Sequence, residues 1–189
     1  MEDEMAAQEY RDNKLRELIL YIAMESEGDE AFGATKLNKL LFYADFIAYV
    51  ELGDSITGEE YQALQWGPAP RRLVPVREKM LEEEEIAIRL RDFHGRPQER
   101  ILALTNADVS RFTSHEIALV SHLILEWWGR TATEMSRQSH RFAGWQLARL
   151  GETIPYEVAL VGGREPTVEE IRRGKELEEL AQELLVEYG

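Results

Sequence analysis

The chain contains no cysteine. This absence excludes disulfide bonds, cysteine-ligated metal sites and thiol nucleophiles. It also has no run of about 18 apolar residues, so we expect no membrane-spanning helix. The N-terminal sequence Met-Glu-Asp-Glu-Met lacks the basic and apolar regions of a secretory signal peptide, and we therefore expect a cytoplasmic protein.

Positive charge is scarce. The 22 Lys and Arg residues face 36 Asp and Glu residues, which gives a formal net charge of −14 at pH 7. A surface of this sign repels phosphates, so we expect no nucleic-acid partner. Residues 130–149 are an exception, with four arginines and one glutamate. This basic stretch is able to bind an acidic partner, although scattered solvated arginines are the simpler interpretation.

The signatures of common enzymes are missing. The sequence has no phosphate-binding loop and no dinucleotide-binding glycine motif. The zinc-protease pattern that begins at 115–116 has no second histidine. Two pairs lie one helical turn apart, His122 with Glu126 and Ser136 with His140, but neither shows the third ligand or orienting carboxylate that its chemistry needs. We therefore expect no enzyme, no metal and no cofactor.

The spacing of apolar residues predicts a mainly α, α+β protein: a single-domain helical bundle around a buried central helix, with a small antiparallel sheet or hairpin. The domain should span 10–161, after an acidic flexible segment 1–9 and before an amphipathic helix in 162–189, packed on the domain or appended to it. The predicted helices are 8–26, 35–52, 70–84, 113–128, 131–140, 144–150 and one opening at Thr167. The predicted strands are 61–66, 86–93 and 98–104.

The central helix is the predicted segment 35–52, which is apolar almost all round. Thr35 is the expected N-cap and Gly53 the C-terminal stop. Asp45 lies inside this helix, and a buried carboxylate must be paired or protonated. We expect an arginine or a tryptophan indole N–H as its partner, with a role as general base as the alternative.

Adjacent tryptophans end the predicted helix 113–128. Trp127 and Trp128 point about 100° apart on a helix, so both cannot easily occupy the centre of one core. One exposed tryptophan would be a favoured anchor for a partner. Packing of both under the last helix explains the pattern equally well.

The segment 35–46, TKLNKLLFYADF, resembles the first signature of the Panacea domain. This is the SocA-like antitoxin family, which also contains phage-associated GepA-like proteins. The resemblance covers 15–161, with further motifs in the family's order: Ile56-Thr57-Gly58, Trp66-Gly67-Pro68, Ser139-His140, Gly144-Trp145 and Ile154-Pro155-Tyr156.

The resemblance implies an antitoxin that neutralises a cognate protein toxin, typically encoded by the adjacent gene, through direct binding. It also implies a possible second mode, because the namesake is a proteolytic adaptor that delivers its toxin to an ATP-dependent protease. From the residues alone, a winged-helix DNA-binding regulator with its wing at Arg96 is the alternative, which the net charge disfavours.

The family motif and the basic stretch supply two sets of candidate residues. The set expected to build the scaffold is Lys36, Leu40, Leu41, Tyr43, Asp45, Trp66, Gly67, Pro68, His140, Trp145, Pro155 and Tyr156. The set expected to contact the partner is the 86–104 hairpin with Arg96, then Trp128, Arg130, Arg137 and Arg141.

Overall fold

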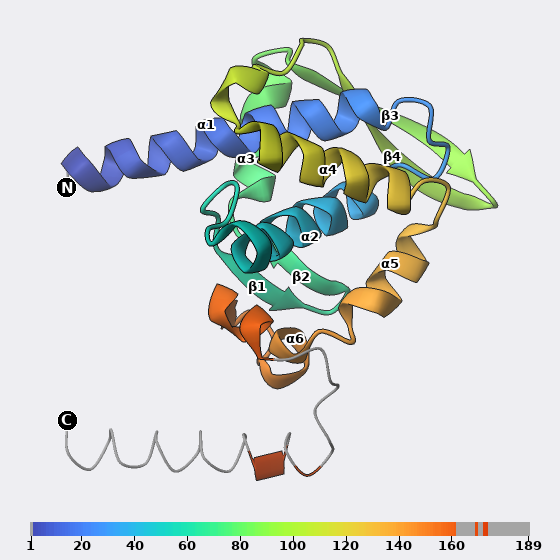
Figure 1. Cartoon of the computed structure of the whole chain (residues 1–189). Coiled ribbons are helices and arrows are strands. Elements are labelled where there is room, and N and C mark those ends of the chain that lie inside the picture. Colours follow the sequence, from blue (N-terminus) through green and yellow to red (C-terminus); the bar gives the residue numbers. More distant parts are fainter. Residues whose placement is uncertain (1, 162–168, 170–171, 174–189) are drawn as a thin grey trace.

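The structure is a computed structural model that describes residues 2–161, 169, 172 and 173. Within this part of the chain, six α-helices are combined with two small antiparallel sheets, which confirms the predicted mainly α fold (Figure 1). The helix predicted to open at Thr167, with the rest of segment 162–189, lies outside the described residues apart from those three positions.

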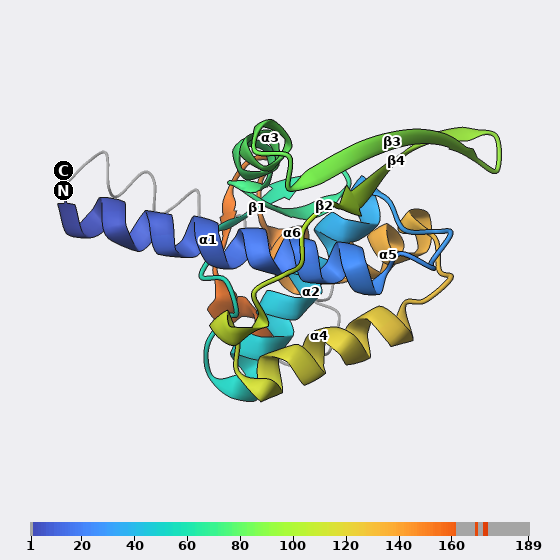
Figure 2. The ribbon, with the colours of Figure 1, turned by 90° about the horizontal axis from the view of Figure 1, so that it is seen from above.

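Two long helices form the centre of the molecule. Helix α1, Glu2–Glu25, begins about six residues before the predicted start, so most of the acidic segment expected to be flexible is helical here. Its N-terminal turns project beyond the rest of the domain (Figures 1 and 2). Helix α2, Ala34–Leu52, runs through the middle of the fold, and ten of its residues are buried, as its composition predicted.

The ends of α2 show one correct and one wrong prediction. Gly53 closes the helix in the left-handed conformation with φ of 88°, as expected. Thr35 is not the N-cap, because the helix already includes Ala34 and its N-cap is Gly33. The backbone N–H of Leu37 donates to the Gly33 carbonyl (2.9 Å), which places the first helical turn earlier than the threonine pattern indicated.

The first sheet has strand order β2-β1-β5 and is antiparallel. Strand β1 is Tyr61–Leu64, β2 is Gly67–Pro70 and β5 is Thr153–Ile154. The sequence predicted a break at Gly67–Pro70, but this segment pairs with β1 over four residues. An edge strand tolerates proline because an N–H that faces away from the ladder is not needed there.

The second sheet is a hairpin that projects from the body of the molecule (Figure 2). After α3, Leu73–Glu82, strand β3, Ile86–Phe93, pairs with β4, Arg96–Ala103. This confirms the hairpin predicted from the two β-prone runs. Pro75 is the third residue of α3, where the missing N–H costs no helical hydrogen bond.

The second half of the chain is helical, as predicted. Helices α4, Ser114–Glu126, and α5, Ala132–Ser139, both open with the predicted capping boxes. The shorter elements are η1 (Val109–Arg111), α6 (Ala143–Leu147) and η2 (Tyr156–Leu160). Helix α2 packs against α1, α4, α5, β2 and η2, which makes it the centre of the core.

Candidate functional site

Three buried charged residues join parts of the chain that are far apart in sequence. Lys36 of α2 donates from Nζ to Asp29 Oδ2 (2.5 Å) and to the backbone carbonyls of Trp127 (2.6 Å) and Arg130 (2.9 Å). The Oδ1 atom of Asp29 accepts from the N–H of Ala31 (2.9 Å). Every donor of the Lys36 ammonium is therefore used, as a buried charge requires.

Arg100 of β4 completes this arrangement, which we call the buried charged cluster (Asp29, Lys36 and Arg100). Its guanidinium donates to the carbonyls of the α1–α2 loop, at Ser26 (3.3 Å), Glu27, Asp29 (2.7 Å) and Phe32 (3.4 Å). The cluster thus ties the α1–α2 loop to the hairpin through Arg100 and to the α4–α5 turn through Lys36.

Sequence reasoning missed two members of this cluster. Asp29 lies in a Glu-Gly-Asp-Glu segment that indicated only a helix stop, and Arg100 lies in a hairpin whose other arginines are exposed or half-buried. One indication was present, since a lysine in a helix that is apolar almost all round needs an anion close by.

The two adjacent tryptophans lie in different surroundings. Trp127 is 7% exposed and stacks on Tyr43 with ring centroids 5.5 Å apart, and the Arg130 guanidinium lies 5.1 Å from its ring centroid. Trp128 is 44% exposed and covers Gly28. One tryptophan is therefore in the core and the other is open to contact, which is one of the two arrangements that the sequence allowed.

Two adjacent cavities form a groove between the hairpin and α5. The first, about 690 Å³, lies between the hairpin tip and the N-termini of α2 and α5, and Arg96 lines it. The second, about 400 Å³, lies beside α5 and is lined by Arg137, His140 and Trp66. Both are lined by Thr35, Ala132 and Thr133, so we treat them as one hairpin–α5 groove.

The groove gathers some of the predicted contact residues and leaves others out. Arg96 and Arg137 line it. Trp128, Arg130 and Arg141 do not, although all three side chains are exposed. Trp66, expected in the scaffold, is 67% exposed at the turn between β1 and β2, which makes it the most exposed tryptophan.

A second buried lysine lies beneath this turn. Lys39 is fully buried, and its Nζ donates to the Pro68 carbonyl (3.2 Å). Burial lowers the pKa of Lys39 to about 8. Gly67 has φ of +102°, and a Cβ there would lie 2.5 Å from both Lys39 Nζ and Ser139 Oγ. Both its backbone conformation and its close contacts therefore require glycine.

His140 stacks on Trp145 with ring centroids 4.0 Å apart and planes 7° apart. Trp145 in turn donates from Nε1 to the Leu64 carbonyl (2.8 Å), which ties α6 to β1. His140 Nε2 is buried without a hydrogen-bond partner among the described residues, so the Ser136–His140 pair is not formed through it. Burial and the nearby Lys39 charge lower the pKa of His140.

Asp45 is fully buried and is held by neutral groups, which corrects the predicted arginine or indole partner. It accepts from the Thr57 N–H (2.8 Å), the Thr57 hydroxyl (2.6 Å) and the Tyr61 hydroxyl (2.7 Å). The chain turns back after Gly53, and this return places Thr57 and Tyr61 beside the middle of α2. Burial raises the pKa of Asp45, and its full enclosure leaves no approach for the substrate of a general base.

Apart from Pro155, the remaining motif residues lie in or beside the core. Leu40 and Leu41 are buried in the main apolar cluster, against which Tyr43 packs. Tyr156 donates its hydroxyl proton to the Glu59 carbonyl (2.6 Å), and its ring lies 4.6 Å from that of Phe46. Pro155 precedes η2 as its N-cap residue and is exposed.

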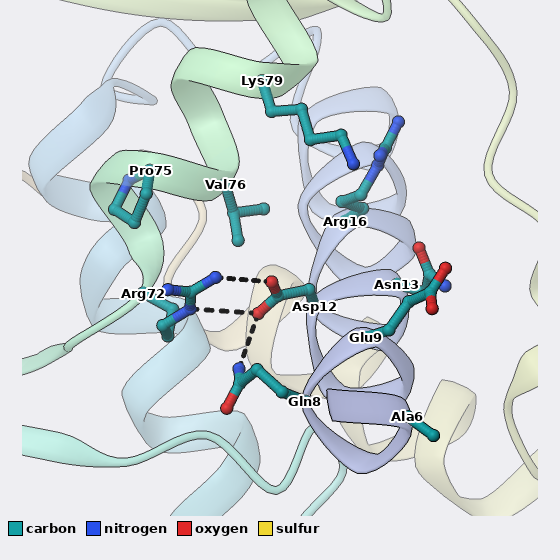
Figure 3. A pocket seen from close by; sticks show the side chains of 10 residues that line it. All are labelled: Ala6, Gln8, Glu9, Asp12, Asn13, Arg16, Arg72, Pro75, Val76 and Lys79. Atoms are coloured by element: carbon teal, nitrogen blue, oxygen red, sulfur yellow. Dashed lines mark hydrogen bonds and ion pairs between the residues drawn. The ribbon is translucent and has the colours of Figure 1, made fainter. Parts of the chain in front are cut away.

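A further cavity of about 590 Å³ separates α1 from α3 (Figure 3). Arg72 donates to both carboxylate oxygens of Asp12 (2.7 and 3.2 Å), and Gln8 donates to the same group (2.8 Å). Burial raises the pKa of Asp12, but the hydrogen bonds from Arg72 and Gln8 outweigh it and hold the pKa below its ordinary value. The polar side chains in this cavity, Gln8, Asp12 and Arg72, therefore bind one another and hold α1 against α3.

Residues 2–161, 169, 172 and 173, which the structure describes, contain no group of three or more His, Asp or Glu residues placed to hold a metal ion. His122 and Glu126 are both exposed on α4. In the same described part, no helix combines the length and the apolar character needed to cross a membrane.

The fold is thus a mainly α domain built around a buried helix, with a hairpin and an open groove on one side. The chain belongs to the antitoxin SocA-like family, Panacea domain, whose model matches residues 37–146. That match covers more than half of the 189 residues, from α2 to α6. No curated protein and no solved structure matches the chain. Family membership supports an antitoxin-type role.

Proposed function

We propose that this protein neutralises a cognate protein toxin by direct binding and that it is not an enzyme. Membership of the SocA-like antitoxin family supports the first part. The observation that carries direct binding is the open hairpin–α5 groove with the exposed Trp66 at one end and arginines at its rim. Tryptophan and arginine dominate the residues that supply binding energy at protein interfaces.

The overall charge favours a basic toxin. With a net charge of −14, the antitoxin attracts a positively charged partner over a distance and speeds their encounter. Such steering weakens as salt screens the two molecules, so the association rate should fall with ionic strength.

A DNA-binding role has less support, because two hairpin arginines are engaged within the protein. Arg91 donates to Gln98 (2.7 Å) and to the Glu30 carbonyl, and Arg100 binds the carbonyls of the α1–α2 loop. These two side chains are not available to phosphates, and the exposed Arg96 at the hairpin tip would act against a net charge of −14 that repels DNA. We therefore propose no nucleic-acid partner.

Co-expression with the adjacent gene tests the proposed function. We expect the adjacent gene alone to arrest growth and this chain to restore it, with a stable complex recovered from the cells. Toxin abundance separates the two modes: simple blocking leaves the toxin level unchanged, whereas an adaptor lowers it only when an ATP-dependent protease is present. A harmless neighbour, or one that stays lethal while this chain is abundant, would contradict the proposal.

A further inference from the structure

We propose that the hairpin–α5 groove binds an extended acidic segment of the partner protein, with an apolar side chain of that segment packed on Trp66. This inference deepens the proposed function and rests on it. It assigns one surface and one chemistry to the contact, which family membership does not do. The argument uses the shape of the groove, its charge and its exposed aromatic end.

The shape of the groove suits an extended chain. The middle section, which lines both cavities, consists of the small uncharged residues Thr35, Ala132 and Thr133, of which Thr35 and Thr133 are exposed. The two cavities share this middle section, so a segment is able to pass from the hairpin tip along α5 to Trp66. No residue at the shared section carries a charge that would block the path.

The charge of the groove is positive although the protein is strongly acidic. Arg96 and Arg137 form no ion pair within the described residues. Glu99 also lines the first cavity, but its carboxylate lies 3.6 Å from the Arg77 guanidinium. Glu134 lies one helical turn before Arg137; its carboxylate accepts from the N–H and hydroxyl of Thr131 and also attracts the Arg137 charge. The groove therefore offers two exposed guanidinium groups to a partner, one of which, Arg137, is partly balanced by Glu134.

The start of α2 adds to this positive potential. Its N-cap residue, Gly33, has no side-chain cap, and its first turn contains no acidic residue. An uncapped N-terminus carries roughly half a positive charge. The two exposed arginines and this helix end all favour a negatively charged ligand. Carboxylates on the partner segment suit these features, and arginine binds carboxylates through paired hydrogen bonds.

Trp66 supplies the apolar contact at the far end. It is 67% exposed, yet the turn that carries it is fixed by the β1–β2 pairing and by the hydrogen bond from Trp145 to Leu64. A large aromatic side chain on a rigid turn loses little entropy on binding, which makes it a good anchor.

A matched pair of charge-reversed variants tests the groove. The groove variant is Arg96→Glu with Arg137→Glu, and the control is Lys79→Glu with Arg111→Glu, exposed cations that lie elsewhere. Both change the net charge equally, so long-range steering shifts alike. With the adjacent gene's purified product as probe, we expect the groove variant to bind at least about tenfold more weakly than the control. Equal affinity of the two variants would overturn the inference.

A photo-cross-linker identifies the occupant directly. Benzoylphenylalanine replaces Thr133, which lines both cavities, and in the control it replaces the exposed Ala118 of α4. We expect the cross-linked partner peptide at position 133 to contain more Asp and Glu than Lys and Arg. A basic peptide, or a cross-link to nucleic acid instead of protein, overturns the inference.

The tests separate this inference from the proposed function. If the wild-type chain fails to neutralise its neighbour, the proposed function itself fails. If the wild-type chain neutralises and the groove variant does so equally well at equal melting temperature, only the groove assignment fails.

Discussion

The two halves of α2 bury opposite charges in different ways. Near its start, Lys36 meets an opposite charge on Asp29 and two carbonyls. Further along, Asp45 meets neutral donors of Thr57 and Tyr61 and, among the described residues, no cation. Between them, Lys39 has a single carbonyl partner, and burial lowers its pKa to about 8. Neutral partners thus leave a buried charge costly, because burial raises the pKa of Asp45 despite its hydrogen bonds and lowers the pKa of Lys39.

Lys36 and Asp45 also hold different segments of the chain in place. Lys36 joins α2 to residues more than 90 positions away, and with Asp29 and Arg100 it fixes the segments next to the hairpin–α5 groove. Asp45 acts over a shorter range, since Thr57 and Tyr61 are 12 and 16 residues away. The first region supports the candidate contact surface, and the second closes the chain reversal after α2.

Replacing the two lysines with methionine should give the largest contrast. Lys36→Met leaves Asp29 as a buried carboxylate without its cation, and we expect a loss of about 3–5 kcal/mol in the free energy of unfolding. Lys39→Met removes one hydrogen bond but also a poorly compensated charge, so we expect a change within about 1 kcal/mol at pH 7. Urea denaturation measures both, and equal losses would refute the distinction.

Substitutions at Asp45 should separate neutral donors from charged ones. Asp45→Ala leaves three buried donors without an acceptor, and we expect a loss of about 3 kcal/mol. Asp45→Asn keeps an acceptor oxygen for Thr57, and no buried cation loses its partner, so we expect less than half of that loss. Thermal and urea unfolding measure both variants. A loss in the asparagine variant as large as that in the alanine variant would indicate that a charge at this position is essential.

The burial of Lys39 should make the free energy of unfolding depend on pH. Its pKa is about 8 in the folded protein against 10.5 as the ordinary value. Between these values the unfolded chain binds a proton that the folded chain has lost, so stability rises with pH across this window, by up to about 3 kcal/mol.

The matched control is Lys39→Met, measured over the same pH range. Other groups that titrate there are common to both proteins, so the difference between the two stability curves isolates Lys39. A constant difference between pH 8 and 10.5 would show that Lys39 does not titrate in this window.

Several local features were predictable because their chemistry acts over a few residues. Two capping boxes, the hairpin and the Gly53 stop follow from spacing and turn residues alone. The strand Gly67–Pro70 was missed because its prolines argue against a strand unless its position at the sheet edge is known. Trp66 is in the predicted scaffold set because it belongs to the family motif, and no local pattern shows which way a turn residue points.

The sequence by itself determined the family, the mainly α fold and the burial of α2, since these depend on motif order and apolar spacing. Only the tertiary structure decided the partners of Lys36, Asp45 and Arg100. It alone also showed that Arg96 and Arg137 line the same groove. The physical reason is that these contacts link segments up to 94 residues apart, and hydrogen-bond geometry at that separation is set by how the helices pack.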